Sequence, residues 1–163
     1  MITLTRATLT GDELDSLVEI CLSQPEYWRS SGDQDPASMS RATLEPTLRE
    51  DAEADGCETL VGRDGTGRVL GFVQMLLRHP TDGHPWIGLL LVDGRQGRQG
   101  YGKAIVTGVE DRFRAEGATA IRLGVLVANA EATPFWEALG YRQIDLRPDR
   151  AKGRPTRVME KLL

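Results

Sequence analysis

The fold is decided by a glycine-rich stretch in the middle of the chain, which joins a hydrophobic segment to a helical one. It follows the apolar residues 86–91 and reads Val92-Asp93-Gly94-Arg95-Gln96-Gly97-Arg98-Gln99-Gly100-Tyr101-Gly102-Lys103-Ala104. A continuous aliphatic run such as 89–92 is typical of a strand buried on both faces, and glycines let the following backbone approach a ligand closely. The helix expected at 103–116 opens with free N–H groups and a dipole that favour phosphate. The stretch therefore predicts a strand, an anion-binding loop and a helix in succession.

The charge of the chain indicates what kind of anion this loop would bind. The formal net charge is −4 over 163 residues, whereas non-specific binding of nucleic acid requires a basic surface. The loop itself carries Arg95, Arg98 and Lys103 and no acid between positions 94 and 103. A local basic patch on an acidic protein favours a small anionic ligand over a polymer.

Two nucleotide-binding loops fit this stretch poorly. A mononucleotide P-loop needs a hydroxyl residue after its lysine, but Ala104 follows Lys103. A dinucleotide fingerprint needs a third glycine at the position that Ile105 occupies. A nucleotide-binding protein with a degenerate P-loop stays open as a further hypothesis, which magnesium-dependent binding of ATP would support.

The remainder of the chain predicts one α/β domain that spans residues 1–163. Hydrophobic periodicity and turn residues predict strands at 2–7, 58–63, 68–77, 86–92, 121–127, 141–146 and 156–162. They predict helices at 13–22, 38–53, 103–116 and 131–139, with Pro46 disturbing the second of these, and irregular structure at 24–36. The strand–loop–helix–strand unit at 86–127 implies one parallel crossover in an otherwise mostly antiparallel sheet.

Cysteine content and hydropathy narrow the class of protein further. Two cysteines make no disulfide framework, and Cys21 lies in a helical apolar pattern as a small buried residue. Two histidines without paired spacing favour no metal site. No stretch approaches the ~20 apolar residues of a membrane span, and residues 1–12 show no signal-peptide pattern. We expect a cytoplasmic protein that binds neither membranes nor nucleic acid.

Two segments of the chain resemble the GNAT superfamily of N-acetyltransferases. The family signature is [Q/R]-x-x-G-x-[G/A] between a strand and a helix; Gly100 and Gly102 match its glycines, while Gly97 departs from its first position. Downstream, Asn129 to Tyr141 resembles the family segment N-x-x-A-x-x-F-Y-E-x-x-G-F. The resemblance covers nearly the whole chain. It implies a mixed, mostly antiparallel sheet of about seven strands with a splayed parallel pair, flanked by about four helices.

The resemblance also implies acetyl-CoA as co-substrate, with its pantetheine arm between the splayed strands. Backbone groups of 90–92 would bond the pantetheine and thioester, the amides of 98–103 would hold the pyrophosphate, and side chains of 129–136 would line the arm and thiol. The implied cofactor-binding residues are Leu90, Leu91, Val92, Arg98, Gln99, Gly100, Tyr101, Gly102, Lys103, Asn129, Phe135 and Trp136.

The catalytic groups are less defined. An attacking amine must lose a proton, so we expect a general base from Glu26, Asp82 or His84, each in a segment that could face the acceptor. The Leu91 or Val92 amide is the expected oxyanion donor. Many family members use a tyrosine as general acid at the position held here by Trp136, which cannot supply a proton. Tyr141, Tyr101 or solvent would replace it.

The sequence thus predicts an N-acetyltransferase that moves an acetyl group from acetyl-CoA to a primary amine of a small molecule or protein. Acids and aromatic residues at 26–35 would suit a cationic or amphipathic amine. A non-catalytic acyl-CoA-binding or sensory domain is the alternative, motivated by Trp136. The family resemblance also suggests a homodimer that pairs through the C-terminal strands.

Overall fold

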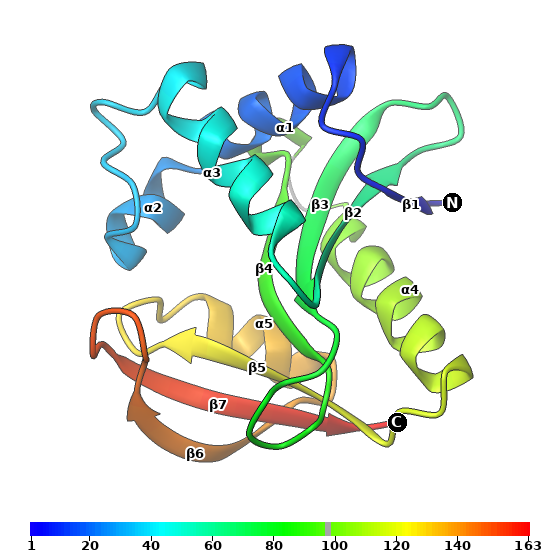
Figure 1. The fold of residues 1–163 in the computed structure, drawn as a ribbon, viewed down its shortest axis with the longest axis vertical. Coiled ribbons are helices and arrows are strands. Elements are labelled where there is room, and N and C mark those ends of the chain that lie inside the picture. The colour runs from blue at the N-terminus through cyan, green and yellow to red at the C-terminus, as the bar shows by residue number, and fades with distance from the viewer. Residues whose placement is uncertain (97–98) are drawn as a thin grey trace.

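A single mixed sheet organises the computed structural model, which describes residues 1–96 and 99–163 (Figure 1). Among these residues its seven strands lie in the order β1-β2-β3-β4-β5-β7-β6. The strands are β1 Thr3–Arg6, β2 Cys57–Arg63, β3 Val69–Leu76, β4 Trp86–Val92, β5 Ala120–Leu126, β6 Arg142–Pro148 and β7 Pro155–Leu162. The helices are α1 Gly11–Leu22, α2 Pro25–Ser31, α3 Arg41–Glu53, α4 Tyr101–Ala115 and α5 Ala132–Ala138, with a 3₁₀ turn at Gly94–Gln96.

The parallel crossover expected from the sequence joins β4 to β5 through α4. All other neighbouring strands pair antiparallel. The parallel pair is short, because only Trp86↔Arg122 and Ile87↔Leu123 are in register. Beyond these two pairs the strands separate, and we call the space between residues 88–92 of β4 and 124–126 of β5 the opening.

A β-bulge at Gly88 marks the point where the two strands part. In the β3–β4 ladder, Met75 pairs with Ile87 and Gln74 pairs with Leu89, so Gly88 is the extra residue. A bulge bends its strand and increases the local twist. The bulge directly follows the last β4–β5 pair, and it therefore accounts for the splay.

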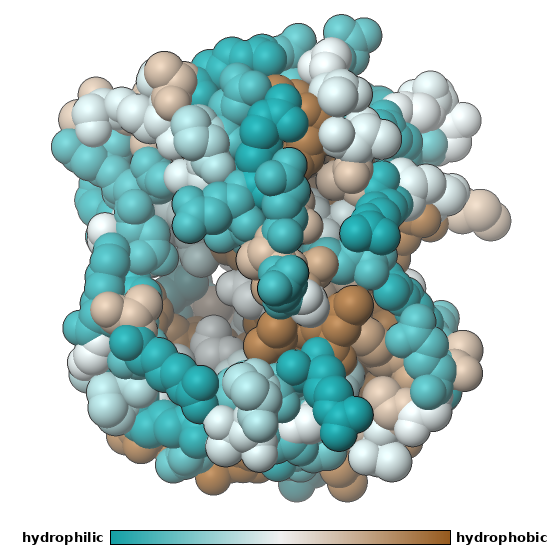
Figure 2. Space-filling view, in the orientation of Figure 1, coloured by the Kyte–Doolittle hydropathy of each residue, from teal (hydrophilic) through white to brown (hydrophobic). Residues whose placement is uncertain are grey.

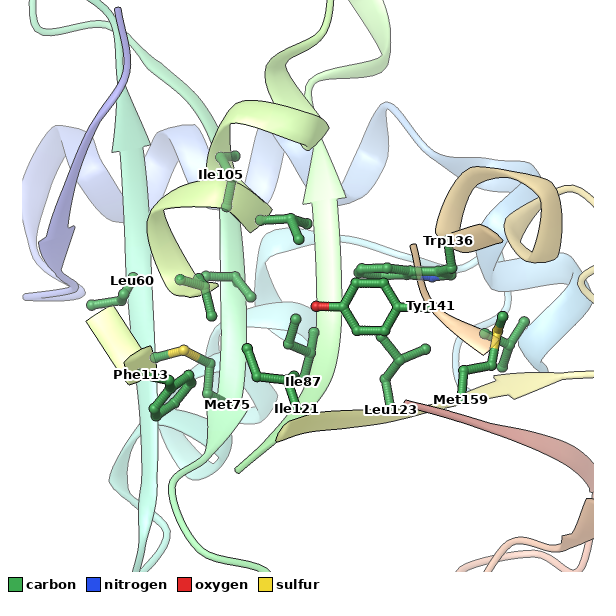
Figure 3. Close-up of a cluster of buried hydrophobic side chains, with 14 residues drawn as sticks. Leu60, Met75, Ile87, Ile105, Phe113, Ile121, Leu123, Trp136, Tyr141 and Met159 are labelled. Atoms are coloured by element: carbon green, nitrogen blue, oxygen red, sulfur yellow. The ribbon is translucent and has the colours of Figure 1, made fainter. Parts of the chain in front are cut away.

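The helices cover both faces of the sheet, because side chains of β2 and β3 alternate between two hydrophobic clusters. Leu60 and Val73 join the cluster under α4, which also contains Phe113 (Figure 3). Val61 and Phe72 join the cluster under α1 and α3. The period of two along each strand places successive residues on opposite faces. This arrangement packs β3 between the two hydrophobic clusters and places it beside β4 in the middle of the strand order.

Two sequence-based expectations are corrected, and the one about Pro46 is confirmed. The segment 24–36 contains a fifth helix, α2, which begins at Pro25, where proline is tolerated because the N–H at that position needs no partner. As the sequence predicted, Pro46 lies within a helix that continues to Glu53, α3, where the proline removes one hydrogen bond without ending the helix. The run 89–92 is only half-buried apart from Leu91, because β4 borders the opening.

No helix in the described part of the chain is both long and apolar enough to span a membrane.

Candidate functional site

The backbone of β4 presents unpaired polar groups to the opening. The Asp93 amide donates to the Leu70 carbonyl of β3 at 2.8 Å. Because backbone groups alternate sides along a strand, Leu91 also directs its N–H and C=O toward β3. Leu90 and Val92 direct theirs toward the opening, where β5 no longer pairs with β4. The sequence assigned all three residues to one role, whereas this geometry separates Leu91 from the other two.

The turn that follows β4 is fixed to the end of α1. The Gln24 side chain donates to the Val92 carbonyl at 2.6 Å, and the Gly94 amide donates to Ser23 Oγ at 2.9 Å. A Cβ on Gly94 would lie 2.5 Å from the Ser23 carbonyl oxygen, so only glycine allows this approach. The contacts set where the chain leaves β4 on its way to α4.

Asp93 reinforces this turn from inside the protein. Its carboxylate is 1% exposed and accepts two bonds from the Arg95 guanidinium, each 2.9 Å long, and one from the Arg95 amide at 3.0 Å. The bonds from Arg95 hold the pKa of Asp93 below its usual value, against the opposing effect of burial. A buried carboxylate paired in this way is stable only in the observed conformation. The Arg95 guanidinium is therefore occupied by a contact within the loop.

The start of α4 offers an anion-binding end. Gly100 precedes it at φ 78°, a left-handed conformation that glycine adopts without strain. The first intrahelical bond runs from Ala104 N to Gly100 O, so the amides of 101–103 have no partner within the helix. Lys103 is exposed in this first turn. Predicted cofactor contacts at Arg98 lie outside the described residues.

Close packing brings the start of α4 against α5 and β4. A Cβ on Gly102 would lie 3.2 Å from Phe135 Cζ and 3.6 Å from Val92 Cγ2. Just before Gly102, the hydroxyl of the half-buried Tyr101 donates to Oε1 of the exposed Gln99 at 2.9 Å. Gly100, Gly102, Phe135 and Val92, all predicted cofactor contacts, thus lie at one end of the opening.

The downstream segment divides into a surface part and a core part. Asn129 follows β5 and is half-buried. Its backbone N–H donates to Leu126 O, and its backbone carbonyl accepts from Ala132 N. Phe135 is 37% exposed, whereas Trp136 is 7% exposed and belongs to the core under α4. Trp136 therefore has a packing role in addition to any contact with a ligand.

Tyr141 is buried, and its hydroxyl is already engaged. It is 1% exposed and lies edge-on to Trp136 (Figure 3). Its hydroxyl donates to Glu110 Oε2 at 2.9 Å, and Glu110 also pairs with Lys161 at 3.0 Å. Burial, followed by the negative charge of Glu110, raises the pKa of Tyr141 well above its usual value. This geometry disfavours the predicted role of Tyr141 as general acid.

A pocket of about 440 Å³ meets the opening from the side of α2. Figure 2 shows it as a hollow between α2 and the β5–β7 strands. We call it the side pocket. It is lined by Tyr27, Asp33, Leu76, His79, Trp86, Ile87, Gly88, Gly124, Leu126, Arg147, Pro148, Asp149, Arg150, Arg154, Thr156 and Val158. Because Gly88 and Gly124 belong to β4 and β5, the pocket reaches the point where these strands separate.

His79 is the histidine that lines the side pocket. Its ring stacks on Trp86, with 4.6 Å between centroids. Its Nδ1 accepts a bond from the Thr81 amide at 3.2 Å and lies 3.8 Å from Asp82 Oδ2. Although burial favours the neutral acid, bonds from the His84 amide and the Trp86 indole lower the pKa of Asp82. Asp82 is therefore an anion positioned beside the imidazole.

The predicted bases Glu26 and His84 do not line this pocket. The Glu26 side chain is 82% exposed on α2 and pairs with Arg29. His84 lies across the β3–β4 loop from His79, where its carbonyl accepts the His79 amide at 2.8 Å. The sequence offered two histidines in one loop, and no local pattern distinguished the one that faces the pocket.

Arg154 pairs with both acids in the pocket wall, and Lys152 also pairs with one of them, Asp33. Arg154 donates to Asp149 Oδ2 at 2.7 Å, to Asp33 Oδ1 at 2.9 Å and to the Ser31 carbonyl at 2.6 Å. Against the opposing effect of burial, bonds from the Lys152 amide and from Arg154 lower the pKa of Asp149 to about 2. Asp149 is thus held as an anion beside Arg154, and Asp33 is paired with the same guanidinium.

Tyr27 closes the pocket on the α2 side. Burial, followed by the charge of Asp33, raises the pKa of its hydroxyl to about 12, so it stays protonated at neutral pH. Tyr27 can donate a hydrogen bond into the pocket but cannot act as a base there. Sequence reasoning noted Tyr27 only as part of an aromatic segment.

Within residues 1–96 and 99–163, no group of three or more His, Cys, Asp or Glu side chains is arranged to hold a metal ion.

Comparison with known proteins agrees with this architecture. The profile of the Acetyltransferase (GNAT) family matches residues 19–141. No curated protein sequence matches the chain. Among solved structures, a GCN5-related N-acetyltransferase from Kribbella flavida is 21% identical with a TM-score of 0.69, covering 99% of this chain and 98% of that one. An acetyltransferase from Thermus thermophilus is 17% identical with a TM-score of 0.73, covering 100% and 97%.

A third neighbour was solved with its ligands. The spermidine N-acetyltransferase of Vibrio cholerae, in complex with CoA and spermine, is 17% identical with a TM-score of 0.69, covering 99% of this chain and 95% of that one. At this identity the three structures show a shared fold. The family match spans most of the chain, including β4, the loop, α4 and α5. The chain therefore belongs to the GNAT family of acetyltransferases.

Proposed function

We propose that the protein is an N-acetyltransferase that moves the acetyl group of acetyl-CoA to a primary amine by direct attack on the thioester. The observation that carries this proposal is the opening between β4 and β5. The strand pairing ends at Ile87↔Leu123, and the free N–H and C=O of Leu90 and the free N–H of Val92 then lead to the unpaired amides of α4. An extended thioester with a pyrophosphate at one end matches both features.

The cofactor would bind largely through backbone groups. The pantetheine arm would bond the N–H and C=O of Leu90 and the N–H of Val92, whose carbonyl is occupied by Gln24. The amides of 101–103 would hold the pyrophosphate, because a helix N-terminus concentrates unpaired donors and positive potential. The Lys103 and Arg98 side chains would add positive charge, and Phe135 would cover the arm beside Gly102.

His79 is the general base that this arrangement favours. A primary amine with a pKa near 10.4 is mostly protonated at neutral pH, so it must lose a proton before attack. Asp33 and Asp149 are paired with Arg154, and the raised pKa of Tyr27 keeps its hydroxyl protonated. Among the side chains of the described pocket wall, His79 is then the one that can accept a proton. Nδ1 would carry a proton and donate it to Asp82 in a hydrogen bond, in place of accepting from the Thr81 amide. Nε2 would then accept the proton of the amine, directly or through a water.

The rest of the reaction would depend on the backbone. As the C–N bond forms, the carbonyl oxygen gains charge, and the Leu90 or Val92 amide would stabilise it because both face the opening. Collapse of the intermediate breaks the C–S bond and releases CoA thiolate. A thiol with a pKa near 8.5 is a good leaving group, so its proton can come from solvent without Tyr141.

A non-catalytic acyl-CoA-binding domain is the second candidate, and one observation favours it. Trp136 stands at the position of the family's usual acid, and Tyr141 is bonded to Glu110. Release of CoA thiol with an amine acceptor would exclude this alternative.

Calorimetric titration with acetyl-CoA tests the cofactor assignment, with ATP and NAD as control ligands. Gly100→Glu should abolish binding, because it places an anion where the pyrophosphate would lie. Gly67→Glu is the matched control: Gly67 also has positive φ and open space around it, but it lies in the β2–β3 turn. Loss of acetyl-CoA affinity in both variants, or absence of binding in the folded wild-type protein, would overturn the assignment. Binding of ATP instead would favour the P-loop hypothesis.

The homodimer and the cytoplasmic location stay predictions. The strand β6 is exposed along its whole length and is the outermost strand of the C-terminal sheet edge. It is therefore the surface whose substitution should be combined with a measurement of molecular mass in solution.

A further inference from the structure

The side pocket carries more positive charge than its acids neutralise, and this excess indicates what the acceptor looks like. We propose that the acceptor is a primary amine that also bears an anionic group, a carboxylate or a phosphate, bound by Arg147 and Arg150. This inference rests on the proposed acetyl transfer and names the substrate class for it.

The acids of the pocket wall are not available to an acceptor. Asp33 lies 2.9 Å from Arg154 and 3.0 Å from Lys152, so two cations already surround it. Two nitrogens of the Arg154 guanidinium contact Asp149 Oδ2. A polyamine entering this pocket would have to displace these partners to gain a counter-charge. The expectation from the sequence that acids at 26–35 suit a cationic amine therefore loses its support.

Two arginines in the same wall remain free to bind an anion. Arg150 donates only to the neutral Thr81 hydroxyl, at 2.7 Å, among the contacts of the described residues. Arg147 has Asp145 at 3.6 Å, with both side chains about half exposed, and an ion pair of this kind contributes little. The Arg147 guanidinium also lies over the Trp86 ring, 5.9 Å from its centroid. This contact places the guanidinium against Trp86 in the wall of the side pocket, which His79 also lines.

The placement of these groups separates the two ends of an acceptor. Gly88 and Gly124 line the end of the pocket at the opening, where the thioester would lie. Arg147 and Arg150 belong to β6 and the β6–β7 loop, and the stacked rings of His79 and Trp86 form a flat wall in the same pocket. The amine would reach the opening while the anionic end meets the two guanidinium groups, which suit planar, bidentate binding of carboxylate or phosphate.

The overall negative charge of the protein makes the positive charge of the side pocket more informative. The chain has a formal net charge of −4, so a positive pocket does not follow from a generally basic surface. Positive charge in a concave site raises the local concentration of anionic ligands and lowers that of cations. The Vibrio cholerae neighbour is described in complex with spermine, and we infer a different acceptor preference for this chain.

Matched pairs of acceptors test the inference by thiol release from acetyl-CoA. The probes are several α-amino acids with their methyl esters, O-phosphoethanolamine with ethanolamine, and spermidine. We expect kcat/KM at least tenfold higher for the anionic member of one pair than for its neutral partner, and lower still for spermidine. The amino-acid pairs report on carboxylate and the phosphoethanolamine pair on phosphate. The preference should weaken as salt increases, because salt screens partly exposed charges.

Arginine variants locate the preference. Arg147→Gln and Arg150→Gln should each raise KM for the anionic acceptor about tenfold, with little change for its neutral partner or in kcat. Arg142→Gln is the matched control, since Arg142 lies on the same strand as Arg147 but outside the side pocket. Affinity for acetyl-CoA should stay unchanged in all three variants, which separates this effect from damage to the fold.

Failure of the inference and failure of the proposed function give different results. If spermidine or the neutral amines are acetylated as well as the anionic ones, or if Arg147→Gln and Arg150→Gln both keep the preference, the anionic acceptor is wrong while acetyl transfer stands. If no probe is acetylated, calorimetry on the CoA-saturated protein decides. Binding of the anionic members that Arg150→Gln weakens supports the inference without catalysis. Absence of such binding overturns it.

Discussion

The two sides of the candidate site are built by different means. On the cofactor side, the groups that face the opening are backbone amides and carbonyls of β4 and α4, positioned by Gly88, Gly94 and Gly100. On the acceptor side, the side pocket is walled by side chains from α2, the β3–β4 loop and the β6–β7 loop. The first side comes from one continuous stretch of sequence, whereas the second exists only after distant segments meet.

This difference explains what each side can vary. Backbone groups survive most substitutions, so the cofactor side depends mainly on where glycine allows the chain to turn or approach. A pocket made of side chains can change its ligand by a few exchanges without altering the fold. In the proposed reaction, the fold therefore constrains the donor more firmly than the acceptor.

The largest effect is expected on the acceptor side, at His79. His79→Gln removes the proposed base and should lower kcat about 100-fold, the lower end of what a positioned proton acceptor contributes. His84→Gln, a matched change in the same loop, should leave kcat within twofold. Steady-state thiol release over a range of pH measures both. Equal losses in the two variants, or none in either, would remove His79 from the mechanism.

An intermediate effect is expected on the cofactor side, at Gly94. Gly94→Ala forces a Cβ to within 2.5 Å of the Ser23 carbonyl oxygen, so α1 or the loop must shift. Overpacking of this kind costs about 1–3 kcal/mol of unfolding free energy, and we expect acetyl-CoA affinity to fall about tenfold. Denaturant unfolding and calorimetry measure the two quantities. Gly65→Ala is the control, because no atom lies within 4 Å of its added Cβ.

The comparison would change if Gly94→Ala lost stability but bound acetyl-CoA like the wild type. The anchor between α1 and the loop would then serve the fold alone, and the cofactor side would be less dependent on glycine than we infer.

The smallest effect on activity is expected at Tyr141, which is buried in the hydrophobic core. Tyr141→Phe removes the bond to Glu110 while Lys161 still pairs with that carboxylate. A hydrogen bond to a charged group contributes about 1.5–3 kcal/mol, so the unfolding free energy should fall by about that amount with kcat unchanged within twofold. Tyr101→Phe, which loses an exposed bond to Gln99, should leave stability nearly unchanged. A large fall in kcat for Tyr141→Phe would restore it as general acid.

The sequence predicted the local structure of the proposed cofactor side well, because its determinants are local. The apolar run into 92, the glycines at 100 and 102 and the start of a helix lie within one stretch, and the parallel crossover follows from their order. The role of Leu91 could not be separated from that of Leu90 and Val92, since this depends on the register with β3. The bulge at Gly88 sets that register, and a lone glycine in an apolar strand does not reveal it.

The acceptor side was predicted poorly for a physical reason. Glu26 and His84 are chemically suitable bases, but nothing in the sequence shows that the first points to solvent and the second away from the side pocket. His79 and Arg150 lie far apart in sequence and line one pocket only because the β3–β4 and β6–β7 loops converge on it. The helix α2 was missed because it is short and rich in turn-forming residues.

The splay of β4 from β5 also bears on how the protein avoids aggregation. An unpaired strand edge is a template on which another chain can add a strand. At the rim of the sheet, β6 carries the charged residues Arg142, Asp145 and Arg147 and ends at Pro148, features that discourage such addition. The edges exposed by the splay lie at the centre of the strand order instead. At this position a slender extended molecule can reach these strand edges, whereas the edge strand of a second folded domain is kept out.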